Sequence, residues 1–209
     1  MIDALEFASC YVYSPAGTGR LCERSRLMRE LLKEGDARFL KHYAERVQEH
    51  MSESPALAGF LSPGDVLVPV PGCVPRRDRG AHAATKLAQA LLEQGLGGDT
   101  WSGLNRIHRV QKSAVAPFSA RPSVALHYES FSIDALPCAA RSLVLVDDIV
   151  TKGRTLFAAA VRLHEAFPDA NIRAFAPLRT MGLIPEVRQL LEPCRGFISW
   201  RRGDARREP

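Results

Sequence analysis

Two adjacent carboxylates follow a short apolar run in the sequence. The run at 142–146 (SLVLV) is typical of a strand buried on both faces, and Asp147 and Asp148 come directly after it. Two aliphatic residues later, the segment 151–155 (TKGRT) carries two threonines around one glycine, and a helical pattern begins. A loop that opens a helix presents unpaired N–H groups and the positive end of the helix dipole. Such a loop suits a phosphate group.

These residue types together predict the binding of a phosphorylated sugar. The paired Asp side chains can accept hydrogen bonds from two vicinal ribose hydroxyls, and Thr151 and Thr155 add hydroxyl donors for an anion. Gly153 has no Cβ, so the backbone can approach that anion closely. One molecule that offers both a phosphate and a diol at this separation is a ribose 5-phosphate. The alternative is a plain strand–turn–helix connection in which an Asp caps the helix.

The same order of residues is known from a family of transferases. Residues 143–155 resemble the phosphoribosyl pyrophosphate (PRPP) signature of type I phosphoribosyltransferases: a hydrophobic strand, two acidic residues, two aliphatic residues and then T-x-G-x-T. The resemblance implies that Asp147 and Asp148 hold the ribose diol and act in catalysis. It also implies Mg²⁺ as the cofactor, held through PRPP and, on the protein side, at most through Asp147. The 5-phosphate loop that it implies consists of Thr151, Lys152, Gly153, Arg154 and Thr155.

A second segment resembles the ComF-like branch of the same superfamily. Residues 68–72 (VPVPG) and 76–80 (RRDRG), followed by an Ala/Leu-rich helix, match its pattern, and the resemblance extends over about residues 65–180. Arginine suits a pyrophosphate because its guanidinium offers paired donors. The alternative for these arginines is a solvated basic loop. The implied pyrophosphate site is a loop of Pro71, Gly72 and Cys73, with Arg76, Arg77 and Arg79 close behind.

The chain also departs from the ComF-like pattern. It has no cysteine-rich zinc module, because its five cysteines lie far apart, and residues 79–83 (RGAHA) replace the usual R-G-F-N-Q. The mobile catalytic loop of the superfamily is expected within 104–123. We take Arg109 and Lys112 as the basic catalytic residues of that loop.

Three single histidines are further candidates for acid–base chemistry. No carboxylate is spaced to pair with any of them, and single histidines are more often surface or packing residues. We therefore assign no catalytic role to His82, His108 and His127.

The predicted fold is a single α/β domain with a mostly parallel, twisted sheet flanked by helices, because strand and helix patterns alternate from residue 65 onward. We expect a core at 63–180, with an N-terminal extension (1–62) and a C-terminal segment (181–209) that form a variable hood. Strands are predicted at 7–13, 65–70, 142–146, 172–177 and 196–200, and residues 124–133 are rich in β-formers. Helices are predicted from Ser25 as N-cap to Gly35, from Asp36 onward, and at 81–92, 156–167 and 185–191.

Composition and charge narrow the class of protein. The chain has 209 residues, a net charge of +5, 46% hydrophobic and 24% charged residues, which is ordinary for a globular domain and excludes a disordered tail, a collagen-like repeat and a coiled-coil rod. Widely spaced cysteines and the lack of an apolar run of membrane length predict a cytoplasmic protein with reduced thiols and no membrane partner. The arginines within 201–207 predict a solvated, frayed tail, with nucleic-acid contact as the less favoured interpretation.

Two functions fit these observations. The first is a PRPP-dependent transferase that moves ribose 5-phosphate from PRPP to an unknown nitrogenous acceptor and releases pyrophosphate. The alternative is a non-catalytic protein on the same fold that senses PRPP or a nucleotide, or a competence-type protein associated with nucleic acid. The sequence leaves open the acceptor, whether the chain turns over PRPP, and whether it forms a homodimer.

Overall fold

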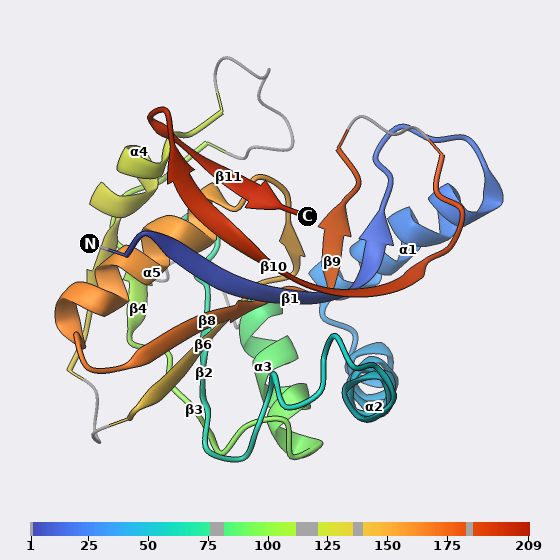
Figure 1. Cartoon of the computed structure of the whole chain (residues 1–209), viewed down its shortest axis with the longest axis horizontal. Coiled ribbons are helices and arrows are strands. Elements are labelled where there is room, and N and C mark those ends of the chain that lie inside the picture. The colour runs from blue at the N-terminus through green and yellow to red at the C-terminus, as the bar shows by residue number, and fades with distance from the viewer. Residues whose placement is uncertain (1, 76–81, 112–120, 136–139, 183–185) are drawn as a thin grey trace.

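A nine-stranded mixed sheet forms the centre of the molecule, and a two-stranded sheet lies apart from it (Figure 1). The structure is a computed structural model and describes residues 2–75, 82–111, 121–135, 140–182 and 186–209. Over these residues the strands are β1 (Ala4–Tyr13), β2 (Val66–Pro69), β3 (Asp99–Thr100), β4 (Leu104–Arg106), β5 (Phe131–Ile133), β6 (Ser142–Val146), β7 (Ile149–Val150), β8 (Asn171–Phe175), β9 (Leu178–Thr180), β10 (Leu191–Arg201) and β11 (Asp204–Glu208). The helices are α1 (Arg20–Glu34), α2 (Ala37–Glu53), α3 (Ala83–Glu93), α4 (Val124–Glu129) and α5 (Arg154–Ala166).

Parallel pairing dominates the large sheet. The strand order along its main path is β11-β10-β1-β8-β6-β2-β3. The five strands β1, β8, β6, β2 and β3 are parallel to one another, whereas β10 pairs antiparallel with both β1 and β11. The short strands β7 and β9 add further parallel pairs beside β1. The small sheet joins β4 and β5 in antiparallel register. The expected α/β fold with a mostly parallel sheet and flanking helices is thus confirmed.

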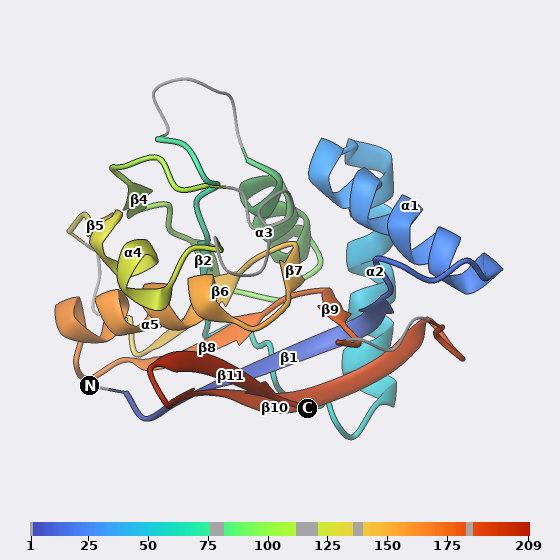
Figure 2. The same ribbon diagram turned by 90° about the horizontal axis from the view of Figure 1, so that it is seen from above.

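Helices cover both faces of the large sheet. The side chains of α4 and α5 belong to the core on one face, and those of α1, α2 and α3 belong to the core on the other. Figure 1 shows α5 and α3 on opposite sides of the strands, and Figure 2 shows α1 and α2 together at one end. In β6, Leu143 and Leu145 join the first core, whereas Val144 and Val146 join the second. This alternation explains why the whole run is apolar.

Local signals set two helix boundaries. Asp36 caps α2, because its Oδ1 accepts the N–H of Phe39 at 2.8 Å, and Gly35 ends α1 in the left-handed conformation at φ 67°. The prediction of Ser25 as an N-cap was wrong, because α1 begins before it; Ser25 is buried, and its hydroxyl donates to a backbone carbonyl of the preceding turn. Within the described ranges, no helix has both the length and the apolar character needed to cross a membrane.

Two predictions for the second half of the chain need correction. Residues 124–133 form the short helix α4 before β5, because Ser123 caps the helix by accepting the N–H of Leu126 at 3.2 Å. The helix predicted at 185–191 was wrong, because residues 186–190 have no helical structure and Leu191 already begins β10.

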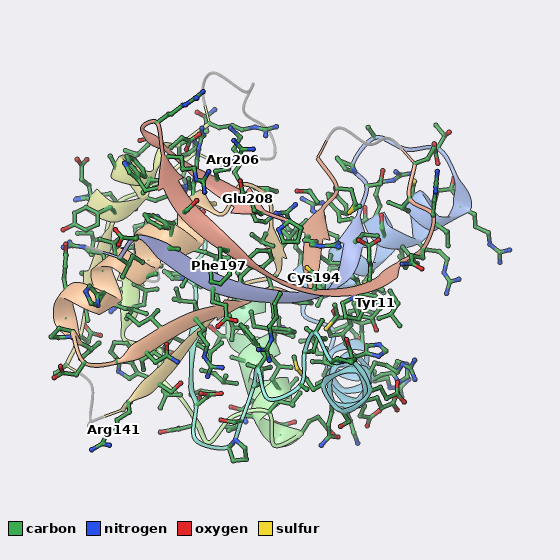
Figure 3. All side chains as sticks on the ribbon, viewed as in Figure 1. Tyr11, Arg141, Cys194, Phe197, Arg206 and Glu208 are labelled. Carbon is green, nitrogen blue, oxygen red and sulfur yellow. The ribbon has the colours of Figure 1, made fainter. Side chains whose placement is uncertain are left out.

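Both ends of the chain contribute strands to the central sheet. β1, which we expected in the N-terminal hood, pairs with β8 on one side and with β10 on the other. The prediction of a frayed C-terminal tail was also wrong, because β11 pairs with β10 along its whole length. In this hairpin Phe197 lies opposite Glu208 (Figure 3). Among the described residues of the expected hood, the helices α1 and α2 lie outside the sheet.

A buried ion pair joins the strands at the end where β2 begins. Asp65 is 1% exposed, and one of its carboxylate oxygens accepts hydrogen bonds from Arg173 Nη2 and from Ser142 Oγ, each at 2.6 Å. The other oxygen accepts the backbone N–H of Ser62 at 2.8 Å. These contacts join β6 and β8 to the start of β2. They lie at the end of the sheet opposite to the predicted site.

Replacing Asp65→Asn should destabilise the fold by about 3 kcal/mol, because the guanidinium of Arg173 would lose its buried counter-charge. Urea denaturation at pH 7 measures this loss. The matched control is Glu45→Gln, which removes an exposed contact with His42 and should cost less than about 0.5 kcal/mol. Equal stability of Asp65→Asn and the control would show that the buried pair is not needed.

Candidate functional site

The carboxyl ends of β2, β6 and β8 meet at one edge of the sheet. Val70 donates its backbone N–H to the Val146 carbonyl at 2.9 Å, and Asp147 donates its N–H to the Phe175 carbonyl at 3.1 Å. The loops that follow β2 and β6 therefore leave the sheet side by side. In open parallel sheets this is the edge at which ligands bind.

One pocket opens at this edge, lined by Arg121, His127, Asp147 and residues 149–156. The structure thus brings Asp147 together with the whole predicted phosphate loop, residues 151–155. Asp148 is not part of this lining. Its Oδ2 lies 3.8 Å from Lys33 Nζ on α1, a contact between distant parts of the chain that no local sequence pattern could indicate.

Gly153 determines the shape of the predicted phosphate loop. It adopts φ 84° and ψ 9°, a left-handed conformation that favours glycine, immediately before the first residue of α5. Its carbonyl accepts the N–H of Phe157 at 2.8 Å and so begins the helical hydrogen bonds. A Cβ at this position would lie 2.6 Å from Cδ1 of Ile198 on β10. The packing of the hairpin formed by β10 and β11 therefore requires glycine at this position, whether or not a ligand binds.

The two acidic residues differ in their surroundings. Burial raises the pKa of Asp147 well above its usual range, and the neighbouring charge of Asp148 raises it further. The backbone N–H of Asp148, which donates to Asp147 Oδ1 at 2.9 Å, and the charge of Lys33 partly oppose this rise. The pair therefore holds negative charge at a free-energy cost, which a cation or a set of hydroxyl donors would reduce.

The side chains of Lys152 and Arg154 bind a carboxylate of the C-terminal hairpin. Asp204 accepts hydrogen bonds from Nε and Nη2 of Arg154 at 2.6 Å each, and Lys152 Nζ lies 3.4 Å from Oδ2. Hydrogen bonding to Arg154 lowers the pKa of Asp204, and the same bonds raise the pKa of Arg154. A ligand in the pocket would therefore meet two cations that already share one carboxylate. Sequence reasoning missed Asp204 because it assigned this segment to a frayed tail.

A buried arginine supports the loop after β2. Arg106 on β4 donates from Nε to the Gly72 carbonyl at 2.7 Å and from Nη2 to the Pro71 carbonyl at 3.4 Å. Its guanidinium lies over the ring of Phe131, 4.1 Å from the centroid. Burial lowers the pKa of Arg106 to about 10, so the side chain stays charged at neutral pH. The sequence placed Arg106 in the expected catalytic loop but did not indicate this supporting role.

None of the remaining predicted residues that the structure describes lines the pocket. Pro71, Gly72 and Cys73 follow β2 and do not line the pocket; the Cys73 carbonyl accepts the N–H of Val110 at 2.9 Å. Arg109 is exposed and does not line the pocket. Four predicted residues lie outside the described part of the chain: Arg76, Arg77, Arg79 and Lys112.

The acidic pair fits a Mg²⁺ ion that is shared with a ligand. Carboxylate oxygens are the donors that Mg²⁺ prefers, and Asp147, which lines the pocket, is followed directly by Asp148. Among the described residues, no cluster of three or more His, Cys, Asp or Glu side chains could hold a metal ion. Mg²⁺ commonly binds through one or two carboxylates together with phosphate oxygens and water. The two carboxylates therefore match a Mg²⁺ ion that a ligand helps to coordinate, and not a metal site in which the protein supplies all the ligands.

Comparison with known proteins leaves the family of the chain open. No family model matches the sequence, and no curated protein matches it. The interpretation of the site therefore depends on its geometry and on the resemblance carried by residues 143–155 and 68–80.

Gly153→Ala should destabilise the protein with or without a ligand. The left-handed conformation costs an L residue about 1–2 kcal/mol, and overpacking against Ile198 adds about 1–3 kcal/mol. Gly59→Ala is the matched control, because Gly59 has φ 68° and open space where a Cβ would lie. Thermal unfolding should show a larger loss for Gly153→Ala than for Gly59→Ala. In an Ile198→Ala background, Gly153→Ala should cost less than it does in the wild type, because the overpacking is relieved. Equal losses at the two glycines would contradict the packing described here.

Asp147→Asn should make the unliganded protein more stable at pH 7. Because the folded-state pKa of Asp147 is raised, the folded protein holds this proton more tightly than the unfolded chain, and wild-type stability falls as pH rises above the usual value of 3.8. The Asp147→Asn variant does not undergo this loss of stability. Its Tm should therefore exceed that of the wild type at pH 7, and the difference should disappear below about pH 3.8. Asp169→Asn, which changes an exposed side chain, is the control. A variant no more stable than wild type at pH 7 would refute the burial argument.

Proposed function

We propose that the protein binds PRPP and transfers its ribose 5-phosphate group to a nitrogen nucleophile, with release of pyrophosphate. The observation that carries this proposal is the pocket at the end of β6, which combines Asp147 with the phosphate loop at 151–155. The order of residues in this segment resembles the PRPP signature and supports the same ligand.

The 5-phosphate binds at the N-terminus of α5. The first backbone N–H groups of a helix have no partner within the helix, and the helix dipole adds positive potential at this end. Thr151 and Thr155 line the same pocket and add hydroxyl groups. Because Asp204 neutralises part of the charge on Lys152 and Arg154, recognition depends mainly on directed hydrogen bonds from the loop.

The ribose hydroxyls donate to the two carboxylates after β6. These hydrogen bonds lower the free-energy cost of two neighbouring negative charges, which the raised pKa of Asp147 reflects. When bound with the ligand, Mg²⁺ supplies positive charge to the pyrophosphate and to these carboxylates. In this proposal the carboxylates also stabilise the positive charge that grows on the sugar ring as the C1–O bond breaks.

The transfer step replaces one bond at C1 of the ribose with another. The lone pair of the acceptor nitrogen forms the new bond, the electron pair of the C1–O bond leaves with pyrophosphate, and the nitrogen releases its proton to solvent. The chain contributes by holding both ends of PRPP in place. The loop at 71–73 receives the pyrophosphate, and Arg106 fixes the backbone of that loop through two of its carbonyls.

The double variant Asp147→Asn/Asp148→Asn should lose PRPP binding and keep its fold. Calorimetric titration with PRPP and Mg²⁺ should show affinity for the wild type and at least a tenfold weaker affinity for the variant, since hydrogen bonds to charged groups contribute about 1.5–3 kcal/mol each. Circular dichroism checks the fold, and Asp169→Asn is the control. Unchanged affinity in the double variant would overturn the assignment of the site.

Turnover is tested separately. Pyrophosphate release with a panel of nucleobases and amines should identify the acceptor class and depend on Asp147 and Asp148. Binding of PRPP without release for any acceptor would contradict the transfer reaction and favour a sensing role on the same fold. Salt-dependent binding of DNA or RNA without turnover would favour the nucleic-acid alternative.

A further inference from the structure

His127 on α4 connects the buried Arg106 to the phosphate loop. Its Nδ1 lies 3.5 Å from Arg106 Nη1, and its Nε2 lies 3.3 Å from Thr155 Oγ1. The side chain is almost fully buried, lines the pocket and stacks on Phe131 with the ring planes 22° apart. The imidazole is therefore held in one orientation between a permanent cation and a hydroxyl of the pocket.

The contact with Arg106 determines which ring nitrogen of His127 carries the proton. A guanidinium has only donors, so Nδ1 must accept from Nη1. A neutral imidazole that accepts at Nδ1 carries its hydrogen on Nε2. The Nε2–H then donates to a lone pair of Thr155 Oγ1, and the hydroxyl hydrogen of Thr155 remains available for another acceptor.

The charged groups around His127 keep it neutral. Burial lowers its pKa to about 4, and the charges of Arg106 and Arg154 lower it as well. Arg121 adds a further positive charge among the residues that line the pocket. Above about pH 5 the imidazole is therefore neutral, and a single tautomer satisfies both of its contacts.

We propose that His127 is a positioning residue that orients the Thr155 hydroxyl as a donor toward the ligand phosphate. This inference depends on the proposed function, because it assigns an anion to the pocket. Thr155 is the second residue of α5, so its hydroxyl lies next to the unpaired N–H groups of the first helical turn. By donating to Oγ1, His127 makes the hydroxyl a better donor to an anion than a freely rotating hydroxyl would be.

NMR of the wild-type protein tests the tautomer without any ligand. Long-range proton–nitrogen correlation spectra should show His127 with a protonated Nε2 and an unprotonated Nδ1 between about pH 6 and 8. The signals should not titrate in this range. A protonated Nδ1, or a mixture of tautomers, would overturn the proposal.

Binding measurements test the consequence for phosphate. Calorimetry with ribose 5-phosphate should show roughly tenfold weaker affinity for Thr155→Val, the range expected for a hydrogen bond to a charged group. His127→Phe should weaken binding several-fold in the wild-type background and by less than about twofold when Thr155 is already Val. His127→Gln keeps an N–H donor and should restore part of the loss. His42→Gln, at an exposed position on α2, is the control and should bind as the wild type does.

The outcomes separate this inference from the proposed function. If the wild type binds neither ribose 5-phosphate nor PRPP, the proposed function fails. If the wild type binds and the losses from His127→Phe and Thr155→Val are additive, the positioning role alone is overturned. Circular dichroism checks the fold of each variant. Should His127→Phe fail to fold, His127→Gln with and without Thr155→Val supplies the same comparison.

Discussion

The end of β6 is held in place from both edges and both faces. Val146 pairs with Pro69 of β2 and with Phe175 of β8, and the apolar side chains of the strand are fully buried in the two cores. Because interiors are tightly packed, a strand bonded in this way cannot shift without disturbing the whole sheet. Asp147 and Asp148 follow β6 directly, so the backbone at both residues is fixed in position by the strand. The phosphate loop and the start of α5 are placed relative to this point.

The last strands of the chain support the loop that lines the pocket. Ile198 packs against Gly153, and Asp204 binds the two basic side chains of the phosphate loop. Trp200 stacks on Phe157 of α5, with ring centroids 6.2 Å apart. The loop is therefore shaped and its charge partly balanced before any ligand binds. Such pre-organisation reduces the entropy cost of binding, and it makes the proposed ligand site dependent on the C-terminal hairpin.

Local patterns predicted the parts of the fold that local physics determines. The continuous apolar run gave β6 its observed bounds, and Asp36 capped α2 as expected, since a buried strand and a helix cap each depend on a few adjacent residues. Helix α4 was missed because β-forming residues were placed in a helix by the Ser123 cap and by packing on α5. The contacts of Asp204 and His127 join distant segments. Residue types at a fixed spacing could indicate the phosphate loop but not the partners that surround it.

A crystal structure of the protein soaked with PRPP and Mg²⁺ tests the central claim most directly, because it locates both ends of one ligand. We expect the 5-phosphate within hydrogen-bond distance of the backbone N–H groups at the start of α5 and of Thr155 Oγ1. The ribose hydroxyls should contact Asp147 and Asp148. PRPP bound at any other place, or an empty pocket in crystals soaked at saturating concentration, would contradict the account.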